Sequence, residues 1–148
     1  MTLIGLDFDN TLVHYDKLFH QLAVEKGLIP ESLSVDKTAI RNYLRSKDQE
    51  QDFTLLQGQV YGLRILEAEP AEGVLESLMT LKELGVSMVL VSHKTKVPFK
   101  GPPYDLRKAA LDWLSKYGFF SSSGIGWSTS QVYFEDTKAS KVSRICSL

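Results

Sequence analysis

The sequence predicts an α/β fold. Three short apolar runs, each ending on polar residues, indicate buried parallel strands at residues 2–6, 86–91 and 131–134. Between the first two runs, residues 13–69 carry three amphipathic helical patterns and no strand pattern. We therefore expect a doubly wound, Rossmann-like core of residues 1–12 and 70–148, with a small helical cap at 13–69 inserted after strand 1. An irregular helical connection is the alternative to the cap.

The composition indicates a globular protein and limits the classes of partner that we expect for it. The chain has 148 residues, enough to bury one core, and its formal net charge is −1. This charge gives no general electrostatic reason to bind nucleic acid or an anionic membrane, so we expect neither as a partner. The single cysteine, Cys146, excludes an internal disulfide. With neither a secretory leader nor a membrane-spanning apolar run in the sequence, we expect a reducing, cytoplasmic location.

Asp7 and Asp9 follow the first apolar run directly. Parallel sheets bind their ligands at the edge where the carboxyl ends of the strands meet. Because side chains two apart on a strand point the same way, both carboxylates can address one substrate atom, while Phe8 turns into the core.

Helical patterns fill most of the remaining chain. In the expected cap they cover residues 15–26, 36–47 and 53–66. The first of these helices is expected to end at Gly27, which Pro30 follows. Pro70 is expected in the first turn of a fourth helix that ends at Gly85. A fifth helix is expected at 105–117, and Thr137 is expected to cap the last one.

The segment Asp7-Phe8-Asp9-Asn10-Thr11 after an apolar strand resembles motif I of the haloacid dehalogenase superfamily, in the form its phosphatases use. Ser92, at the end of the second apolar run, is similar to motif II. The resemblance covers almost the whole chain, from motif I through the cap to the last helix. It implies a magnesium-dependent phosphohydrolase that acts on a phosphate monoester through an aspartyl-phosphate intermediate.

The resemblance also implies roles for the motif residues. Asp7 would be the nucleophile, and Asp9 the acid that protonates the leaving group and later activates water. Ser92 would donate a hydrogen bond to a phosphoryl oxygen. A lysine of the last helix would neutralise the nucleophile and the phosphate, with Lys141 favoured and Lys138 the alternative.

Neighbours of these motifs are expected to contact a small phosphorylated substrate: Asn10, Thr11, His93 and Lys94. The last of these opens a basic, proline-punctuated loop at 94–103. That loop either attracts the substrate or is a solvated connector.

Mg²⁺ is implied because a carboxylate and a phosphate dianion repel each other in a partly desolvated site. Asp7 and the backbone carbonyl of Asp9 would supply two ligands. The family's motif IV acids lie on a further strand that the sequence does not contain. Either Asp136 substitutes as a metal ligand or the usual metal acid is absent.

A sheet that lacks this further strand would be truncated and would leave strand 1 with an unpaired edge. We therefore expect the chain to pair with a second copy through that edge, as a homodimer, and to bind Mg²⁺ only in roughly the millimolar range or worse. The alternative function is a catalytically impaired phosphate-binding or interaction module of the same fold. The sequence leaves the identity of the substrate open.

Overall fold

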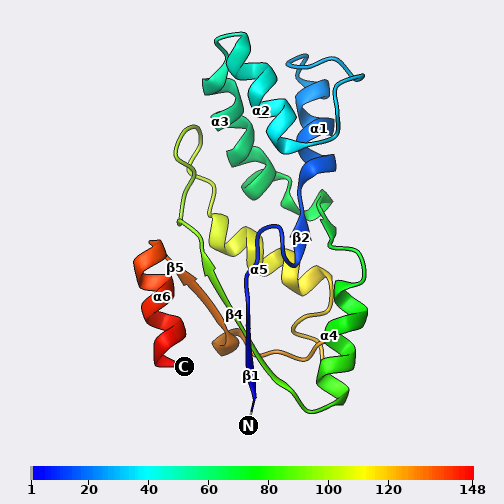
Figure 1. Ribbon diagram of the computed structural model, residues 1–148, viewed down its shortest axis with the longest axis vertical. Helices are drawn as coiled ribbons and strands as arrows, with labels where there is room; N and C mark the ends of the chain where they lie inside the picture. Colours follow the sequence, from blue (N-terminus) through cyan, green and yellow to red (C-terminus); the bar gives the residue numbers. More distant parts are fainter. Residues whose placement is uncertain (1) are drawn as a thin grey trace.

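A parallel sheet forms the centre of the core. The computed structural model describes residues 2–148. Its sheet contains β1 (Leu3–Leu6), β4 (Ser87–His93) and β5 (Val132–Glu135) in the order β1-β4-β5. Both pairings are parallel, with Leu6 opposite Leu90 and Leu90 opposite Val132. The carboxyl ends of the three strands therefore meet at one edge, which carries the residues that follow Leu6 and Val91 (Figure 1).

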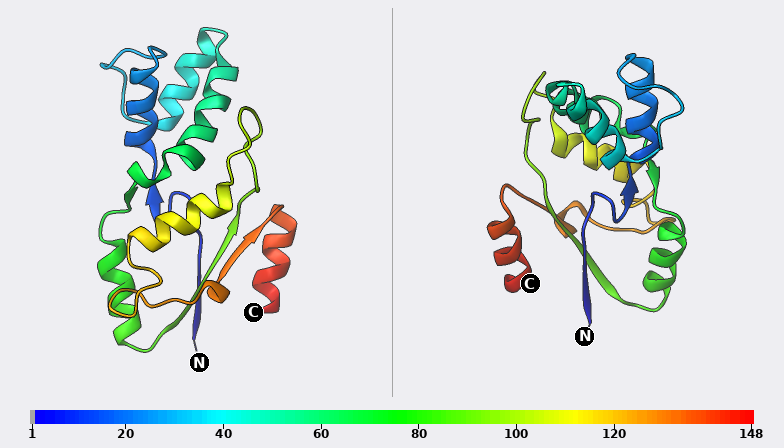
Figure 2. Two further views of the ribbon diagram at one scale, coloured as in Figure 1. Left: turned by 180° about the vertical axis from the view of Figure 1, so that it is seen from behind. Right: turned by 45° about the horizontal axis from the view of Figure 1, so that its top comes forward.

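Helices flank the sheet and extend beyond one end of it (Figures 1 and 2). The helices beside the sheet are α4 (Val74–Glu83), α5 (Leu106–Lys116) and α6 (Lys138–Ser147). The helices at the far end are α1 (Asp16–Glu25), α2 (Lys37–Ser46) and α3 (Glu50–Gly58). The predicted α/β class is confirmed as a mixed fold of six α-helices and a small parallel sheet within residues 2–148. None of the helices described there is long and apolar enough to cross a lipid bilayer.

The helical segment leaves the core and returns to it through a short antiparallel ribbon. Its strands are β2 (Val13–His14) and β3 (Glu69–Pro70), with Val13 opposite Pro70. The prediction that Pro70 starts a helix is wrong: α4 begins at Val74, after Gly73 in a left-handed conformation with φ of 75°. A proline lacks the N–H of a ladder hydrogen bond but is tolerated in an edge strand, which the ribbon provides.

The third helix of the far end differs from its prediction. It begins at Glu50, and its regular part ends at Gly58. It continues as a π-helical turn, η1 (Gln59–Leu63), and a 3₁₀ turn, η2 (Ile65–Glu67). A Cβ atom at Gly62 would lie 2.7 Å from the Cβ of Tyr104, so only glycine lets this turn approach the segment before α5 so closely.

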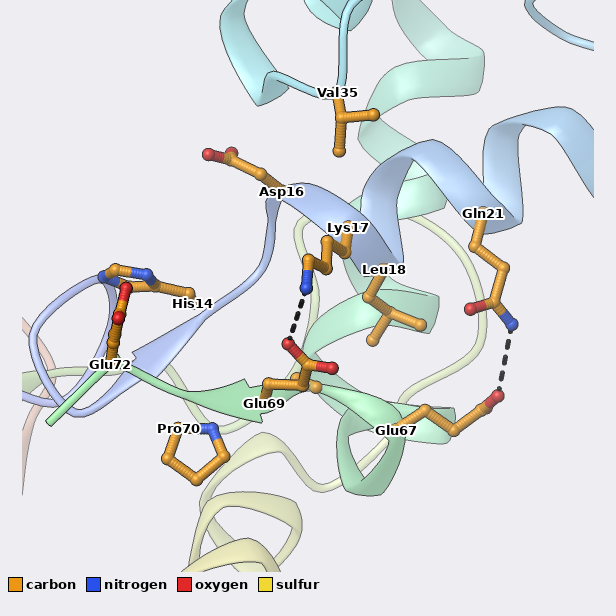
Figure 3. A pocket seen from close by; sticks show the side chains of 11 residues that line it. His14, Asp16, Lys17, Leu18, Gln21, Val35, Glu67, Glu69, Pro70 and Glu72 are labelled. Carbon is orange, nitrogen blue, oxygen red and sulfur yellow. Dashed lines mark hydrogen bonds and ion pairs between the residues drawn. The ribbon is translucent and has the colours of Figure 1, made fainter. Parts of the chain in front are cut away.

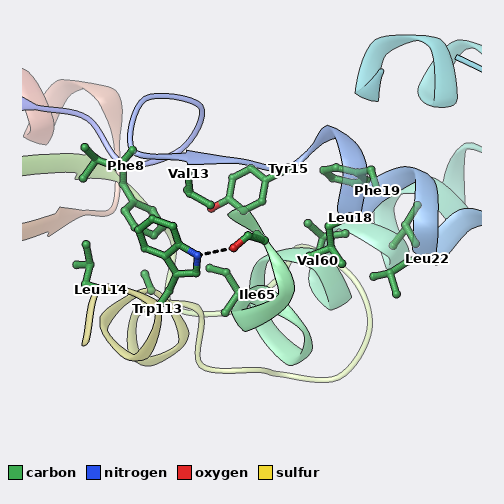
Figure 4. Close-up of a cluster of buried hydrophobic side chains, with 14 of the residues drawn as sticks. Phe8, Val13, Tyr15, Leu18, Phe19, Leu22, Val60, Ile65, Trp113 and Leu114 are labelled. Carbon is green, nitrogen blue, oxygen red and sulfur yellow. Dashed lines mark hydrogen bonds between the residues drawn. The ribbon is translucent and has the colours of Figure 1, made fainter. Parts of the chain in front are cut away.

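Buried aromatic side chains join the sheet to the helices (Figure 4). The rings of Phe8 and Trp113 are fully buried and meet edge to face, with centroids 5.5 Å apart. The indole Nε1 of Trp113 donates to the carbonyl of Ala68 at 2.9 Å, so its polar atom is satisfied inside the core. Burying a side chain such as Phe8 contributes about 1.5–3 kcal/mol to folding. The residue between the two aspartates is thereby fixed in the core.

Candidate active site

A tight turn fixes the two aspartates after β1. The backbone N–H of Phe8 donates to Asp7 Oδ1 at 2.8 Å. Asn10 has a φ of 62°, and its N–H donates to the carbonyl of Val13 at 2.9 Å. Asparagine tolerates this left-handed conformation better than most residues. The turn lets Phe8 enter the core while Asp7 and Asp9 remain at the sheet edge.

A cavity of about 460 Å³ opens at this edge. Its lining comes from the turn after β1, the end of β4 and the first turns of α6: Asp7, Asp9, Asn10, His93, Lys138, Lys141 and Val142. Two aspartates and two lysines thus line one cavity. The structure brings together most of the residues that the sequence assigned to catalysis.

Lys141 pairs with the expected nucleophile. Its Nζ lies 3.2 Å from Asp7 Oδ2, and both side chains are partly exposed, at 24% and 44% respectively. The position follows from the capping of α6, because Thr137 accepts a hydrogen bond from the N–H of Ser140 at 3.0 Å and starts the helix beside the sheet edge. A partly solvated pair of this kind stabilises the fold only slightly. Its main effect is to place positive charge at the Asp7 carboxylate.

Asp9 has two donors on one oxygen. The hydroxyl of Tyr15 donates to Asp9 Oδ1, and Lys94 Nζ lies 3.2 Å from the same atom. Lys94 is only 4% exposed, so its ammonium group contacts Asp9 within the protein and is absent from the cavity lining. Burial, followed by the charge of Asp9, raises the pKa of the Tyr15 hydroxyl well above its ordinary value, which keeps it a donor. This role of Tyr15 was not predicted from the sequence, because a tyrosine at the start of an amphipathic helix is typical of core packing.

Three other predicted site residues lie outside the cavity lining. Ser92 is 1% exposed, and its Oγ has no hydrogen-bond partner among the described residues. The carboxylate of Asp136 lies 2.6 Å from the guanidinium of Arg107, so the structure does not bring it together with the other two aspartates. Its main-chain carbonyl accepts a hydrogen bond from His93 Nε2 at 3.0 Å, which orients that ring. Thr11 is exposed, and its N–H donates to the carbonyl of Phe8 at 3.2 Å.

The oxygen atoms at this sheet edge offer Mg²⁺ only the smallest number of protein ligands that it commonly has. Mg²⁺ is commonly bound by one or two carboxylates, with water and substrate phosphate completing the octahedron. Asp7 and the main-chain carbonyl of Asp9 could provide that minimum. Across residues 2–148, no cluster of three or more His, Cys, Asp or Glu side chains is arranged to hold a metal ion. A cation at Asp7 would also compete with Lys141 for the carboxylate.

A larger cavity, of about 790 Å³, lies beside the β2–β3 ribbon (Figure 3). Acidic residues dominate its charged lining: Asp16, Glu67, Glu69 and Glu72, with Lys17 paired to Glu69 at 3.1 Å. This concentration of carboxylates repels a phosphate dianion. The smaller cavity, with its two lysines, suits an anionic substrate better.

Searches of protein-family models, curated proteins and solved structures found no match to this chain. The similarity to the haloacid dehalogenase superfamily therefore rests on the residues themselves, above all the segment from Asp7 to Thr11.

Proposed function

We propose that this protein is a phosphohydrolase of the haloacid dehalogenase type, with a doubly wound core and a helical cap, that cleaves phosphate monoesters through an aspartyl-phosphate. One observation carries the proposal. Lys141 Nζ lies 3.2 Å from Asp7 Oδ2, at the carboxyl end of β1, in a cavity that Asp9 also lines. Nucleophile, acid and charge-neutralising cation are the groups that this reaction requires.

The reaction divides into two displacements at phosphorus. A carboxylate oxygen of Asp7 forms a bond to phosphorus while the bond to the ester oxygen breaks, and Asp9 gives its proton to that oxygen. Water then attacks the aspartyl-phosphate, Asp9 takes its proton, and phosphate leaves with the Asp7 carboxylate restored. Lys138 and Lys141 compensate the negative charge that accumulates as the dianion approaches Asp7.

Asp7 and the main-chain carbonyl of Asp9 would hold Mg²⁺, which when bound neutralises charge between the nucleophile and the phosphate. Activity should accordingly depend on added Mg²⁺ and fall when EDTA removes it. Because the side-chain ligands are few, saturation is expected only at roughly millimolar Mg²⁺.

The decisive variant is Asp7→Asn, which preserves side-chain volume and removes the nucleophile. With p-nitrophenyl phosphate and Mg²⁺, turnover should fall to background. The labelled phosphoenzyme that acid quenching traps in the wild type should also be absent. Asp48→Asn is the matched control, since Asp48 is exposed in a turn at φ of 56°, which asparagine adopts readily. Undiminished turnover in Asp7→Asn would refute the proposal.

A phosphate-binding module without turnover is the second candidate. It is favoured by the burial of Ser92 and by the pairing of Asp136 with Arg107, since neither side chain lines the cavity. Calorimetry with inorganic phosphate separates the two functions. Binding without hydrolysis of any ester, abolished in Lys141→Ala, would support the module.

A further inference from the structure

Two donors from distant parts of the chain converge on one oxygen of Asp9. Tyr15 lies where the chain passes from β2 into α1, and Lys94 follows the end of β4. The Tyr15 hydroxyl donates to Asp9 Oδ1, and Lys94 Nζ is 3.2 Å from it. The two donors are 1% and 4% exposed, so water competes little for these bonds. No comparable partner is described for the second oxygen, Oδ2, among residues 2–148.

Packing holds both donors in place. The ring of Tyr15 meets the ring of Tyr61 with centroids 4.8 Å apart. The ammonium of Lys94 lies 5.3 Å from the ring centroid of Phe8 and 5.4 Å from that of Tyr61, within the range of cation–π attraction. Tyr61 belongs to the turn after α3, so one aromatic ring from the helical end touches both donors.

The backbone of Lys94 is fixed as well. Its N–H donates to the carbonyl of Glu135 at 3.0 Å, and its own carbonyl accepts a hydrogen bond from Arg107 Nε at 2.9 Å. The Lys94 side chain therefore extends to Asp9 from a main chain that is held on both its N–H and its carbonyl. A buried cation with one carboxylate partner and two aromatic neighbours has little freedom to serve a substrate in the cavity as well.

We propose that Tyr15 and Lys94 are positioning residues for Asp9, which hold Oδ1 and leave Oδ2 to exchange the proton with the leaving group and then with water. This inference rests on the proposed function. A catalytic acid works only within hydrogen-bond reach of the atom it protonates, and a displacement of about 1 Å can cost about a hundredfold in rate. Two donors on one oxygen prevent the carboxyl group from rotating out of reach.

The first test compares substrates that need the acid to different degrees. Tyr15→Phe keeps the ring and removes the hydroxyl, and Lys94→Met keeps an apolar stem and removes the charge. Each should lower kcat/KM about tenfold or more for an alkyl phosphate, whose leaving oxygen must be protonated. Each should change kcat/KM less than about twofold for p-nitrophenyl phosphate, whose leaving group departs without a proton. Tyr43→Phe, in α2, is the control and should leave both substrates unaffected.

Equal losses for both esters in Tyr15→Phe would overturn the proposal, because a general structural defect would then explain them. Unchanged kinetics for both esters would overturn it too. The result that supports the proposal is a loss of kcat/KM for the alkyl phosphate alone.

A second test needs no turnover. In protein labelled at the tyrosine Cζ, the Tyr15 resonance, assigned by its loss in Tyr15→Phe, should have a different chemical shift at neutral pH in Asp9→Asn than in the wild type. The reason is that the Tyr15 hydroxyl donates to a carboxyl oxygen of Asp9 only in the wild type. The Tyr43 resonance should be the same in both proteins. If the wild type hydrolyses no ester, the proposed function fails. The contact of Tyr15 with Asp9 is disproved separately, by a Tyr15 resonance that is the same in the wild type and in Asp9→Asn.

Discussion

Lys138 and Lys141 lie one helical turn apart on α6 and line the same cavity, yet only Lys141 is paired with Asp7, at 3.2 Å. Removing a donor to a charged group costs about 1.5–3 kcal/mol. We therefore expect Lys141→Ala to lower kcat about 10- to 100-fold and Lys138→Ala far less, measured at saturating substrate. Lys108→Ala, on exposed α5 surface, serves as the control. A larger loss in Lys138→Ala would transfer the role to that residue.

Ser92 gives a prediction on stability as well as on binding. Its Oγ is buried without a partner among the residues described, and such a hydroxyl costs about 1–3 kcal/mol. Ser92→Ala should therefore leave the free energy of unfolding unchanged or raise it by about 1 kcal/mol in urea titrations. Ser32→Ala, at an exposed site, should change nothing.

If Ser92 also donates to a bound phosphate, Ser92→Ala weakens phosphate binding while the protein becomes no less stable. A marked loss of stability would show instead that the hydroxyl has a partner in the folded protein.

At the end of β4, the sequence assigned three consecutive residues to the site, and side-chain alternation separates them. His93 lines the cavity, whereas Ser92 and Lys94, which precede and follow it in the chain, are buried and do not line it. Side chains alternate along a strand, so the sequence predicts that His93 points to one face and its two neighbours to the other. Which face borders the cavity depends on the packing of the strand against the helices. The contact between Tyr15 and Asp9 escaped prediction for the same reason, since it depends on how the helical end sits on the core.

At the scale of elements, the π-helical turn η1 depends on Gly62. A Cβ there would lie 2.7 Å from Tyr104 Cβ and 3.2 Å from Leu106 Cδ2. Gly62→Ala should lower the free energy of unfolding by about 1–3 kcal/mol in urea titrations, because the turn and the segment before α5 must separate. Gly5→Ala is the matched control: nothing lies within 4 Å of its Cβ position, so it should be neutral. Equal stability of the two variants would contradict the close packing.

Most elements were predictable because their signals are local. The strands after Met1 and Gly85 and the fifth helix lie within one or two residues of their predicted bounds, and Thr137 caps the last helix as predicted. Pro70 was misplaced because its pairing with Val13 joins residues far apart in sequence. Local patterns carry no information on such a partner. The division into core and cap domains stays a prediction.

At the scale of the whole molecule, β1 lies at the edge of the sheet and pairs with β4 alone in the described part of the chain. Leu3 on this strand is 43% exposed. An uncovered apolar edge favours pairing with a second copy. We expect the protein to form dimers at micromolar concentrations in analytical ultracentrifugation, and Leu3→Lys to shift them toward monomers.

Val35→Lys places the same charge at an exposed apolar residue of the helical end and should leave the dimer intact. A wild-type protein that stays monomeric across the concentration range would show that the edge is protected.

The β2–β3 ribbon also bears on how quickly the sheet can assemble. Leu6 and Leu90 pair across a loop of about 80 residues, and closing such a loop carries an entropic penalty that grows with its length. Once Val13 meets Pro70, the helical segment becomes a closed side loop, and the remaining connection between β1 and β4 is only about 25 residues long. The entropy still to be lost falls by roughly 1 kcal/mol. Two residue pairs outside the parallel sheet thus make it easier for the chain to bring Asp7 beside β4.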